Sequence, residues 1–334
     1  MRAAVVVPGG QYEITEVADP SPGPGELLLR VTACGFCGSD LKARDAMPAG
    51  TIMGHEFAGE IVGIGTDVSA GAGADMAGWR VGTHVAVLPA LSCGRCEWCA
   101  TGHVIHCPRV RLVGLGGTAG AFAELAVVTA AAAFPLPPEI DPRHGALVEP
   151  FAVGLHCVRT GRLEPGEDVL VVGSGAVGLT TIAWARARGA GRITAVDPAA
   201  IRRAAAESFG ATDVLTSVDQ AEAGAYHLVV ECAGRAGLLD ACVTAARPRG
   251  RIVLAGVTIE ATPFQSWAAL MKEVSVGFAV YYTPEEFRTV VAAFGSGLID
   301  PAPLLARRVE LAQVNEAFDA LARTAASAKI LVEP

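Results

Sequence analysis

The alternation of apolar runs with helical segments after about residue 165 restricts the fold of this chain more than any other feature. Helical segments lie at 176–188, 199–209 and 236–246, among strand candidates at 168–172, 192–196, 211–215, 228–232, 251–255 and 274–279. Strands joined by helical crossovers are typical of a parallel sheet with helices on both faces. We therefore predict an α/β fold with a doubly wound parallel sheet in this part of the chain.

A glycine-rich motif follows the first of these strands. The apolar run 169–172 leads into Gly173-Ser174-Gly175-Ala176-Val177-Gly178 and then into a helical pattern. The first glycine permits a tight turn, the second lets the backbone approach a pyrophosphate at the helix N-terminus, and the third allows close packing of helix and strand. Asp197 ends the next strand, 19 residues after Gly178, where a carboxylate can accept the ribose hydroxyls. The motif predicts a dinucleotide site, and a glycine turn with an unrelated aspartate is the alternative.

The residues after this second strand bear on the choice of cofactor. A carboxylate at Asp197 would repel the additional phosphate of NADP, which favours NAD. Arg202 and Arg203 follow closely and can reach a phosphate, so NADP stays open as an alternative. The predicted cofactor-binding residues are Gly173, Gly175, Val177, Gly178, Asp197 and Arg202.

The first 150 residues have a different, β-rich pattern. Leu27–Ala33 and Phe57–Gly65 are apolar or alternating runs bounded by Gly and Pro, as in strands, whereas the Gly- and Ala-rich stretch 66–82 fits no regular element. Helical segments at 285–294 and 311–323 and a last strand, Lys329–Val332, follow the alternating region. Because 334 residues suffice for two domains, we predict domains at 1–151 and 152–282, with 283–334 returning to the first.

Composition and charge argue against several classes of protein. Hydrophobic residues make up 51% of the chain and charged residues 18%, which indicates a globular protein. A net charge of −8 without a basic stripe argues against a nucleic acid partner. No apolar run is long enough to span a membrane, and the apolar start is too short for a signal peptide. We therefore expect a cytoplasmic protein whose nine cysteines are reduced and available to metals.

Four cysteines within fifteen residues form the strongest local signal in the sequence. Cys93, Cys96 and Cys99 are spaced by two residues each, and Cys107 follows. Four thiolates are the ligand set of a closed, tetrahedral structural zinc site. Disulfides or free buried thiols are the alternatives, and His103 and His106 are rival ligands nearby.

A second group of candidate ligands is dispersed along the first 150 residues. Its core is Cys34-Gly35-Phe36-Cys37-Gly38-Ser39-Asp40, where a thiol is followed two residues later by a hydroxyl. Gly54-His55-Glu56 adds an imidazole and a carboxylate, and Glu149 adds another carboxylate. Taken singly, Cys34 and Cys37 could be a redox pair, His55 a core histidine and Glu56 a surface acid. Together they predict one catalytic zinc.

These motifs, in this order, resemble the zinc-dependent medium-chain alcohol and polyol dehydrogenases, in particular the branch of sorbitol and threonine dehydrogenases. The resemblance implies a GroES-like catalytic domain, a Rossmann cofactor domain, and two zinc ions per chain, one catalytic and one structural. It implies that Cys37 and His55 bind the catalytic zinc, with Glu56 or Glu149 completing the protein ligands. Cys34 would then be a packing residue, and Cys157, Cys232 and Cys242 would be buried thiols.

The resemblance also implies the reaction. Zinc would lower the pKa of a bound alcohol, hydride would pass to the nicotinamide, and Ser39 would take the alcohol proton. Lys42 stands where the family often has a relay histidine, so either Lys42 or water would carry the proton onward. Phe57, Phe122 and Phe151 are candidates to line a substrate cleft, with a place in the core as the alternative.

We therefore predict NAD-dependent oxidation of a secondary alcohol or polyol. An NADP-preferring aldehyde or ketone reductase of the same fold is one alternative, and a non-catalytic dinucleotide-binding protein is the other. The expected partners are a small alcohol or ketone substrate and other copies of the chain, in a homodimer or homotetramer, with the apolar strand at 274–279 as a candidate interface.

Overall fold

The computed structural model describes residues 1–68, 78–323 and 329–334. Of Lys42, Ala322 and Arg323 it describes only the backbone. The chain forms two compact units: unit 1 contains Met1–Glu149 and the C-terminal segments from Thr283 onward, and unit 2 contains Pro150–Tyr282. Most of the unplaced stretch 66–82 lies outside the described residues. Within the described residues, no helix combines the length and the apolar character that crossing a membrane requires.

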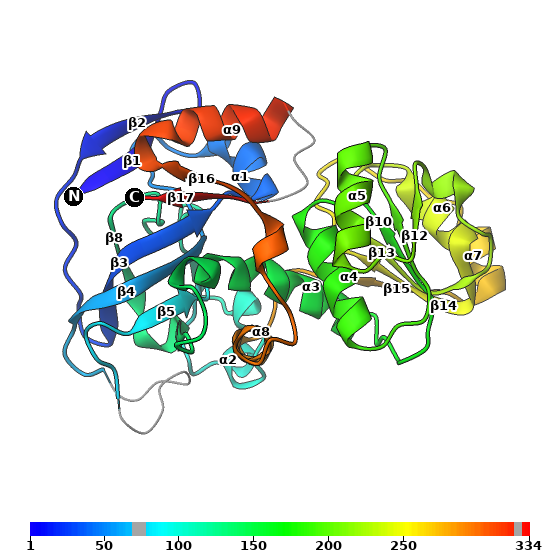
Figure 1. The fold of residues 1–334 in the computed structure, drawn as a ribbon, viewed down its shortest axis with the longest axis horizontal. Coiled ribbons are helices and arrows are strands. Elements are labelled where there is room, and N and C mark those ends of the chain that lie inside the picture. The colour runs from blue at the N-terminus through cyan, green and yellow to red at the C-terminus, as the bar shows by residue number, and fades with distance from the viewer. Residues whose placement is uncertain (69–77, 324–328) are drawn as a thin grey trace. The chain divides into compact units, whose positions relative to one another are not determined.

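Unit 2 is built on a parallel sheet with the strand order β12-β11-β10-β13-β14-β15. Helices α4 and α5 cover one face of the sheet, and α6 and α7 cover the other (Figure 1). This arrangement confirms the predicted doubly wound sheet. The strands are β10 (Val169–Val172), β11 (Ile193–Val196), β12 (Asp213–Leu215), β13 (Tyr226–Glu231), β14 (Ala246–Leu254) and β15 (Ser275–Phe278). The helices are α4 (Ala176–Ala187), α5 (Ala200–Phe209), α6 (Leu238–Ala245) and α7 (Ser266–Lys272).

The central strands of this sheet are short, apolar and buried throughout. All residues of β10 and β11 are buried, as expected for parallel strands covered by helices on both faces. Because the strands are parallel, their carboxyl ends all lie at the same end of the sheet, where α/β proteins bind ligands.

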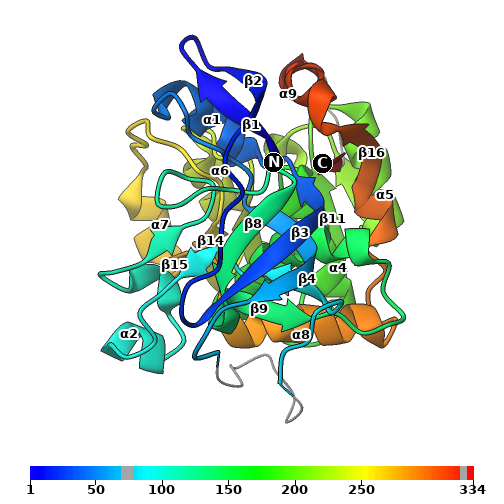
Figure 2. The same ribbon diagram turned by 90° about the vertical axis from the view of Figure 1, so that its left-hand side faces the viewer.

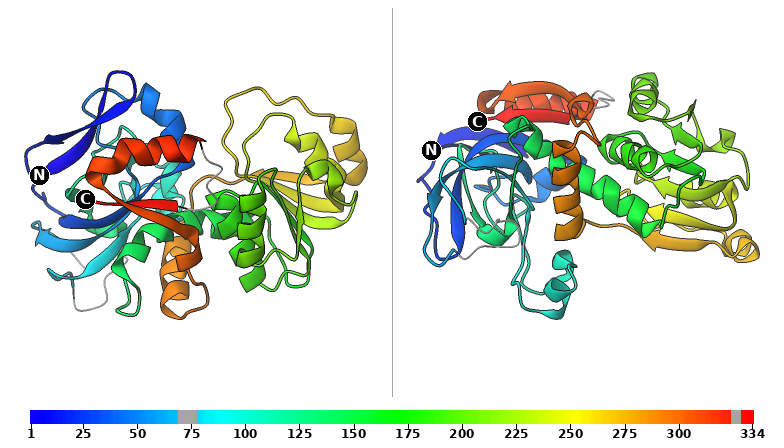
Figure 3. Two further views of the ribbon diagram at one scale, coloured as in Figure 1. Left: turned by 45° about the horizontal axis from the view of Figure 1, so that its top comes forward. Right: turned by 60° about the horizontal axis from the view of Figure 1, so that its bottom comes forward.

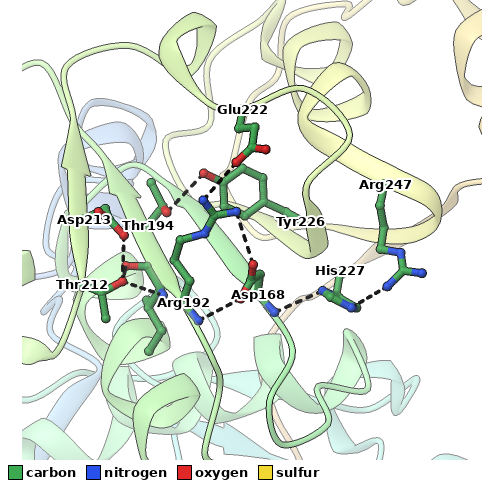
Figure 4. Close-up of polar contacts among 10 residues, drawn as sticks. Asp168, Arg192, Thr194, Thr212, Asp213, Glu222, Tyr226, His227 and Arg247 are labelled. Carbon is green, nitrogen blue, oxygen red and sulfur yellow. Dashed lines mark hydrogen bonds and ion pairs between the residues drawn. The ribbon is translucent and has the colours of Figure 1, made fainter.

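A polar network lies at the opposite end of the sheet, where these strands begin (Figure 4). The guanidinium of Arg192 lies 3.2 Å from the Asp168 carboxylate, 3.1 Å from that of Glu222, and 5.0 Å from the centre of the Tyr226 ring. The Tyr226 hydroxyl donates a hydrogen bond to Thr194 Oγ1 at 3.2 Å. These contacts join the beginnings of β10, β11 and β13. They do not occupy the carboxyl ends of these strands, where a ligand can bind.

Unit 1 is β-rich and built around the strand order β16-β17-β3-β4-β5-β9, with β8 paired to β3 (Figure 2). The last strand pairs antiparallel with β3, with Leu331 opposite Gly35 and Val332 opposite Cys34. The C-terminal strand is therefore part of the sheet of unit 1. The strands of this sheet are β3 (Glu26–Gly35), β4 (Glu56–Ile64), β5 (His84–Val87), β8 (Leu125–Thr129), β9 (Ala133–Pro135), β16 (Leu305–Glu310) and β17 (Lys329–Glu333).

Smaller elements complete unit 1. Strands β1 (Arg2–Val7) and β2 (Gln11–Glu16) pair with each other, as do β6 (Ala90–Leu91) and β7 (Arg111–Leu112). The helices are α1 (Gly38–Ala43), α2 (Glu97–Ala100), α8 (Pro284–Gly295) and α9 (Val314–Arg323), and α3 (Val148–Thr160) begins in unit 1 and continues into unit 2.

The aromatic side chains that were candidates for a substrate cleft lie in the core instead. Phe57 and Phe122 belong to the hydrophobic cluster of unit 1, where Phe122 packs 4.8 Å from the ring of Phe36. Phe151 is fully buried as well. The alternative of a core position is therefore correct for these three phenylalanines.

Candidate metal sites and dinucleotide cavity

Four cysteine sulfurs converge in a lobe of unit 1 that contains α2 and projects from the sheet in the right-hand view of Figure 3. The Sγ atoms of Cys93, Cys96, Cys99 and Cys107 lie within 4.8 Å of one another. Cys99 Sγ is 3.5 Å from Cys96 Sγ and 3.9 Å from Cys93 Sγ. Tetrahedral zinc with bonds of about 2.3 Å separates neighbouring sulfurs by about 3.8 Å, whereas a disulfide needs about 2.05 Å. The spacing therefore fits a zinc tetrahedron, and the disulfide alternative is wrong.

The surroundings of the lobe shift the pKa values of its thiols in opposite directions. The Cys99 backbone N–H lowers the pKa of Cys96, but desolvation and the neighbouring side chains of Cys99 and Cys93 outweigh it and raise this pKa to about 11. Hydrogen bonding by the Arg95 backbone N–H, assisted by the Arg109 guanidinium, lowers the pKa of Cys93 to about 5.

His106 packs edge-on against Trp98 with 5.4 Å between ring centres, and the His103 ring centre lies 6.4 Å from that of His106. Neither histidine belongs to the group of converging ligand atoms. The donor set is therefore four sulfurs.

A second cluster brings together Cys37, His55 and Glu56, whose ligand atoms lie within 4.8 Å of one another. Sheet register explains the convergence: Gly35 of β3 is opposite Glu56 of β4, so Cys37 and His55 leave the same end of two paired strands. Gly54 has a φ of +97°, and a Cβ atom there would lie 2.7 Å from Cys34 Sγ. Only glycine fits at this turn, which places His55 beside Cys37.

Asp40 is a functional candidate that sequence reasoning missed. Its side chain is fully buried, its Oδ2 accepts a hydrogen bond from the Cys37 N–H at 2.9 Å, and its Oδ1 lies 3.2 Å from His55 Nδ1. Burial alone would lower the pKa of His55, but Asp40 and Cys37 outweigh it and hold this pKa well above its usual range. A carboxylate at Nδ1 fixes the imidazole and leaves Nε2 for a ligand, as in many metal sites. The available sequence signal was an aspartate three residues after Cys37.

Glu56 is held by Lys329 of β17, a second residue that sequence reasoning missed. Lys329 Nζ contacts Glu56 Oε1 and donates a hydrogen bond to the Phe36 carbonyl at 3.0 Å, and both side chains are almost completely buried. Burial lowers the pKa of Lys329, but Glu56 outweighs it, and the net shift is upward. Glu56 Oε2 is buried and accepts no hydrogen bond from any described group. Glu56 therefore has an unoccupied acceptor that suits a metal ligand.

The remaining predicted site residues of unit 1 lie close by, without joining the three-residue cluster. Glu149 is buried in the first turn of α3, and its charge contributes to the raised pKa of Lys329. Ser39 is half-buried in α1, two residues after Cys37. Lys42 belongs to the same helix, with its side chain outside the described residues.

The glycine motif of unit 2 has the conformation that its sequence predicts. Gly173 has a φ of +96°, and α4 begins directly after Gly175. A Cβ atom at Gly178 would lie 1.9 Å from the Gly173 carbonyl oxygen, so the turn and the helix can pack only with glycine there. Val177 lies in the first turn of α4, where its carbonyl accepts hydrogen bonds from the Thr180 and Thr181 hydroxyls.

A cavity of about 340 Å³ lies at the carboxyl ends of β10, β11 and β13, next to this motif. Asp197 is buried in its wall, with Oδ2 accepting from the Ser174 N–H at 3.0 Å and Oδ1 from the Ala199 N–H at 2.9 Å. Cys232, which we expected to be buried, is half-buried and lines the cavity. The size is in the range of small-ligand pockets. Further lining residues are Gly173, Gly175, Arg202, Thr216, Ser217 and Arg235.

Family models match both units. The model of the alcohol dehydrogenase GroES-like domain matches residues 23–138, and that of the zinc-binding dehydrogenases matches residues 176–296. L-threonine 3-dehydrogenase from Pyrococcus horikoshii is 32% identical, over 97% of this chain and 95% of its own. The chain belongs to the zinc-binding alcohol dehydrogenase family.

A curated relative and a solved structure are also similar to this zinc-binding dehydrogenase. Sorbitol dehydrogenase from Bacillus subtilis (strain 168) is 28% identical, with 96% of this chain and 93% of the relative covered. A zinc-binding dehydrogenase from Sinorhizobium meliloti 1021, solved bound to NADP, is 31% identical with a TM-score of 0.89, and the match covers 100% and 99% of the two chains. Membership of this family makes the protein an oxidoreductase that uses a nicotinamide cofactor, and the predicted enzyme class is confirmed.

Proposed function

We propose that this dehydrogenase oxidises a secondary alcohol or polyol with NAD, at a zinc ion bound by Cys37, His55 and a carboxylate. The cluster of Cys37, His55 and Glu56 carries the proposal, because a thiol, an imidazole and a carboxylate converge there. Three protein ligands leave the fourth position of a catalytic zinc to a water or a substrate. The relatives named above act on sorbitol and at position 3 of L-threonine, both of which carry a secondary hydroxyl.

The carboxylate ligand is Glu56 or Glu149. Glu56 belongs to the cluster; Lys329 contacts its Oε1, and its Oε2 accepts no hydrogen bond from a described group. Glu149 is buried nearby and adds negative charge around Lys329. A carboxylate in the place of a second thiolate makes the ligand set harder.

Zinc would supply a Lewis acid that polarises the substrate oxygen, and the nicotinamide would accept the hydride. The residues of the chain have separate tasks. Asp40 orients the imidazole of His55 by facing Nδ1, and the Ser39 hydroxyl receives the proton of the substrate alcohol, since a hydroxyl accepts and donates at once. Lys42 or water then takes that proton from Ser39.

The cofactor is assigned to the cavity of unit 2, with NAD favoured. The turn at Gly173 and Gly175 gives the pyrophosphate access to backbone N–H groups, and Asp197 faces the adenosine ribose. A second zinc, bound by Cys93, Cys96, Cys99 and Cys107, is structural, because four sulfurs leave no open position. A reducing compartment such as the cytoplasm suits these thiols.

The function is tested by NADH formation with the zinc-loaded protein. The substrates are secondary alcohols and polyols, each paired with the primary alcohol of equal carbon number, and zinc per chain is measured on the same samples. We expect two zinc ions and a kcat/KM at least about tenfold higher for one or more secondary alcohols. One zinc per chain and no turnover would contradict both the site and the reaction.

We further propose that the dehydrogenase forms a dimer through β15. This strand pairs only with β14 among the described residues, so its outer edge offers unpaired backbone groups. Val276 and Phe278 alternate along it, Val280 follows its end, and all three are exposed, Phe278 by 75%. Helix α7 carries further exposed apolar side chains, Trp267, Leu270 and Met271. A second copy can pair its own β15 with this strand about a two-fold axis, because a two-fold interface is formed by the same surface of both copies.

Phe278→Glu is expected to shift the protein from dimer to monomer, because two carboxylates would face each other in the proposed interface. Sedimentation velocity at micromolar concentration measures the shift. Leu298→Glu is the matched control, since Leu298 is an exposed apolar residue of unit 1. A dimer that survives Phe278→Glu places the interface elsewhere.

A further inference from the structure

The cavity of unit 2 holds more positive than negative charge. Its charged lining side chains are Asp197, Arg202 and Arg235, so one carboxylate and two guanidinium groups leave a net charge of +1. A cavity of this charge attracts an anionic ligand, although the aspartate alone would repel one.

The negative charge of Asp197 is already stabilised within the protein. Its two oxygens accept hydrogen bonds from the N–H groups of Ser174 and Ala199, and Arg202 Nη1 lies 3.7 Å from Oδ2. Arg203 fixes the backbone at Asp197 by donating hydrogen bonds to the carbonyls of Asp197 and Pro198. The carboxylate therefore repels a neighbouring anion less than an isolated aspartate would.

Arg202 retains unused hydrogen-bond donors. The distance of 3.7 Å to Asp197 is an ion-pair contact and too long for a hydrogen bond. Its Nε is buried without a partner among the described residues. The side chain as a whole is 33% exposed, so the terminal Nη groups are the donors that a ligand in the cavity can reach. A guanidinium with free donors in a cavity wall suits a phosphate, which accepts two parallel hydrogen bonds from arginine.

Arg235 is the second cation, and the backbone that carries it is fixed. Glu231 is buried at the end of β13, and its Oε1 accepts hydrogen bonds from the N–H groups of Ala233 and Gly234, each at 2.7 Å. The exposed Arg235 follows directly and forms no ion pair or hydrogen bond with any residue that the structure describes. The turn therefore places an arginine without a charged partner among the described residues in the lining of the cavity.

The hydroxyl groups of the cavity are committed to other partners. Thr216 Oγ1 donates to Gln220 Oε1 at 2.9 Å, and Ser217 Oγ donates to Asp219 Oδ2 at 3.0 Å. Among the charged and hydroxyl side chains of the lining, the two arginines therefore hold the free donors.

We infer, on the basis of the proposed dinucleotide site, that Arg202 and Arg235 form a two-arginine clamp for the ribose 2′-phosphate of NADP. The cavity thus accepts both dinucleotides. Asp197 receives the free ribose of NAD, and the clamp receives the phosphate of NADP. Arg235 is the determinant of this second specificity, because its charge has no partner among the residues that the structure describes.

The test compares binding of NADPH and NADH by titration of nicotinamide fluorescence, without an alcohol substrate. The proteins are zinc-loaded wild type, Arg235→Gln and Arg188→Gln. Arg188 is the matched control because it is exposed at the end of α4 and does not line the cavity. Wild type is expected to bind NADPH within about tenfold of NADH, and Arg235→Gln to weaken NADPH at least about tenfold and NADH less than about threefold.

Two outcomes would overturn the clamp. Wild-type binding of NADPH more than about a hundredfold weaker than that of NADH would show that Asp197 excludes the phosphate. Equal weakening of both dinucleotides by Arg235→Gln would assign Arg235 to a group that they share. Absence of binding by either dinucleotide would instead refute the proposed cofactor site, and missing alcohol turnover with intact binding would refute only the proposed reaction.

Discussion

Cys37→Ala is expected to remove one of the two proposed zinc ions and to lower turnover by about a thousandfold. The substitution deletes the thiol from the cluster and leaves His55 and Glu56, which are too few ligands for a tight site. Zinc contributes several kcal/mol to transition-state stabilisation, and about 1.4 kcal/mol corresponds to a factor of ten in rate. Zinc per chain and kcat with the best alcohol of the panel are the measurements.

Cys34→Ala is the matched control for this loss. Cys34 is buried in the core of unit 1, three residues before Cys37, and it is no member of the ligand cluster. The control should therefore keep both zinc ions and most of the turnover, at a small cost in stability from the lost packing. If Cys34→Ala loses zinc as Cys37→Ala does, the two sulfurs act as a pair, and the ligand set proposed here is wrong.

The fold of unit 2 could be predicted because its signals are local. The buried run at β10, the glycine turn and the helix after it follow each other within about twenty residues, and each needs only its neighbours to be recognised. Helix α7 escaped prediction because Ser266–Lys272 exposes apolar side chains and has no polar face to set a helical period. The short strands β5 to β9 of unit 1 carry too few residues for an alternating pattern.

The candidate site was predictable where ligand spacing is a sequence property. The four cysteines of the lobe and the pair Cys37 and His55 are of this kind, because metal ligands are few in type and fixed in geometry. Asp40 lies inside the same motif, but its contact with His55 depends on how β3 and β4 pair. Lys329 gave no signal at all. It follows Glu56 by 273 residues, and only the pairing of β17 with β3 brings the two together.

Lys329→Met is expected to lower the free energy of unfolding of the zinc-free protein by about 3–5 kcal/mol. The lysine and Glu56 are 5% and 1% exposed, so removal of the cation leaves a carboxylate buried without a counter-ion. The Phe36 carbonyl also loses its hydrogen bond from Nζ. Urea unfolding of protein stripped with a chelator measures the loss, and near-native circular dichroism before urea is the check on folding.

The double variant Lys329→Met with Glu56→Gln separates charge from packing. Glutamine keeps the size of Glu56 but not its charge, so the double variant should recover most of the lost stability, since neutral replacement of a buried ion pair often costs little. Zinc binding provides a second test, which shows whether Glu56 is a metal ligand. If Glu56 is a metal ligand, loading Lys329→Met with zinc places a cation next to the unpaired carboxylate, and the variant should gain more stability from zinc than wild type does. An equal gain would indicate that Glu56 stays away from the metal and would leave Glu149 as the carboxylate ligand.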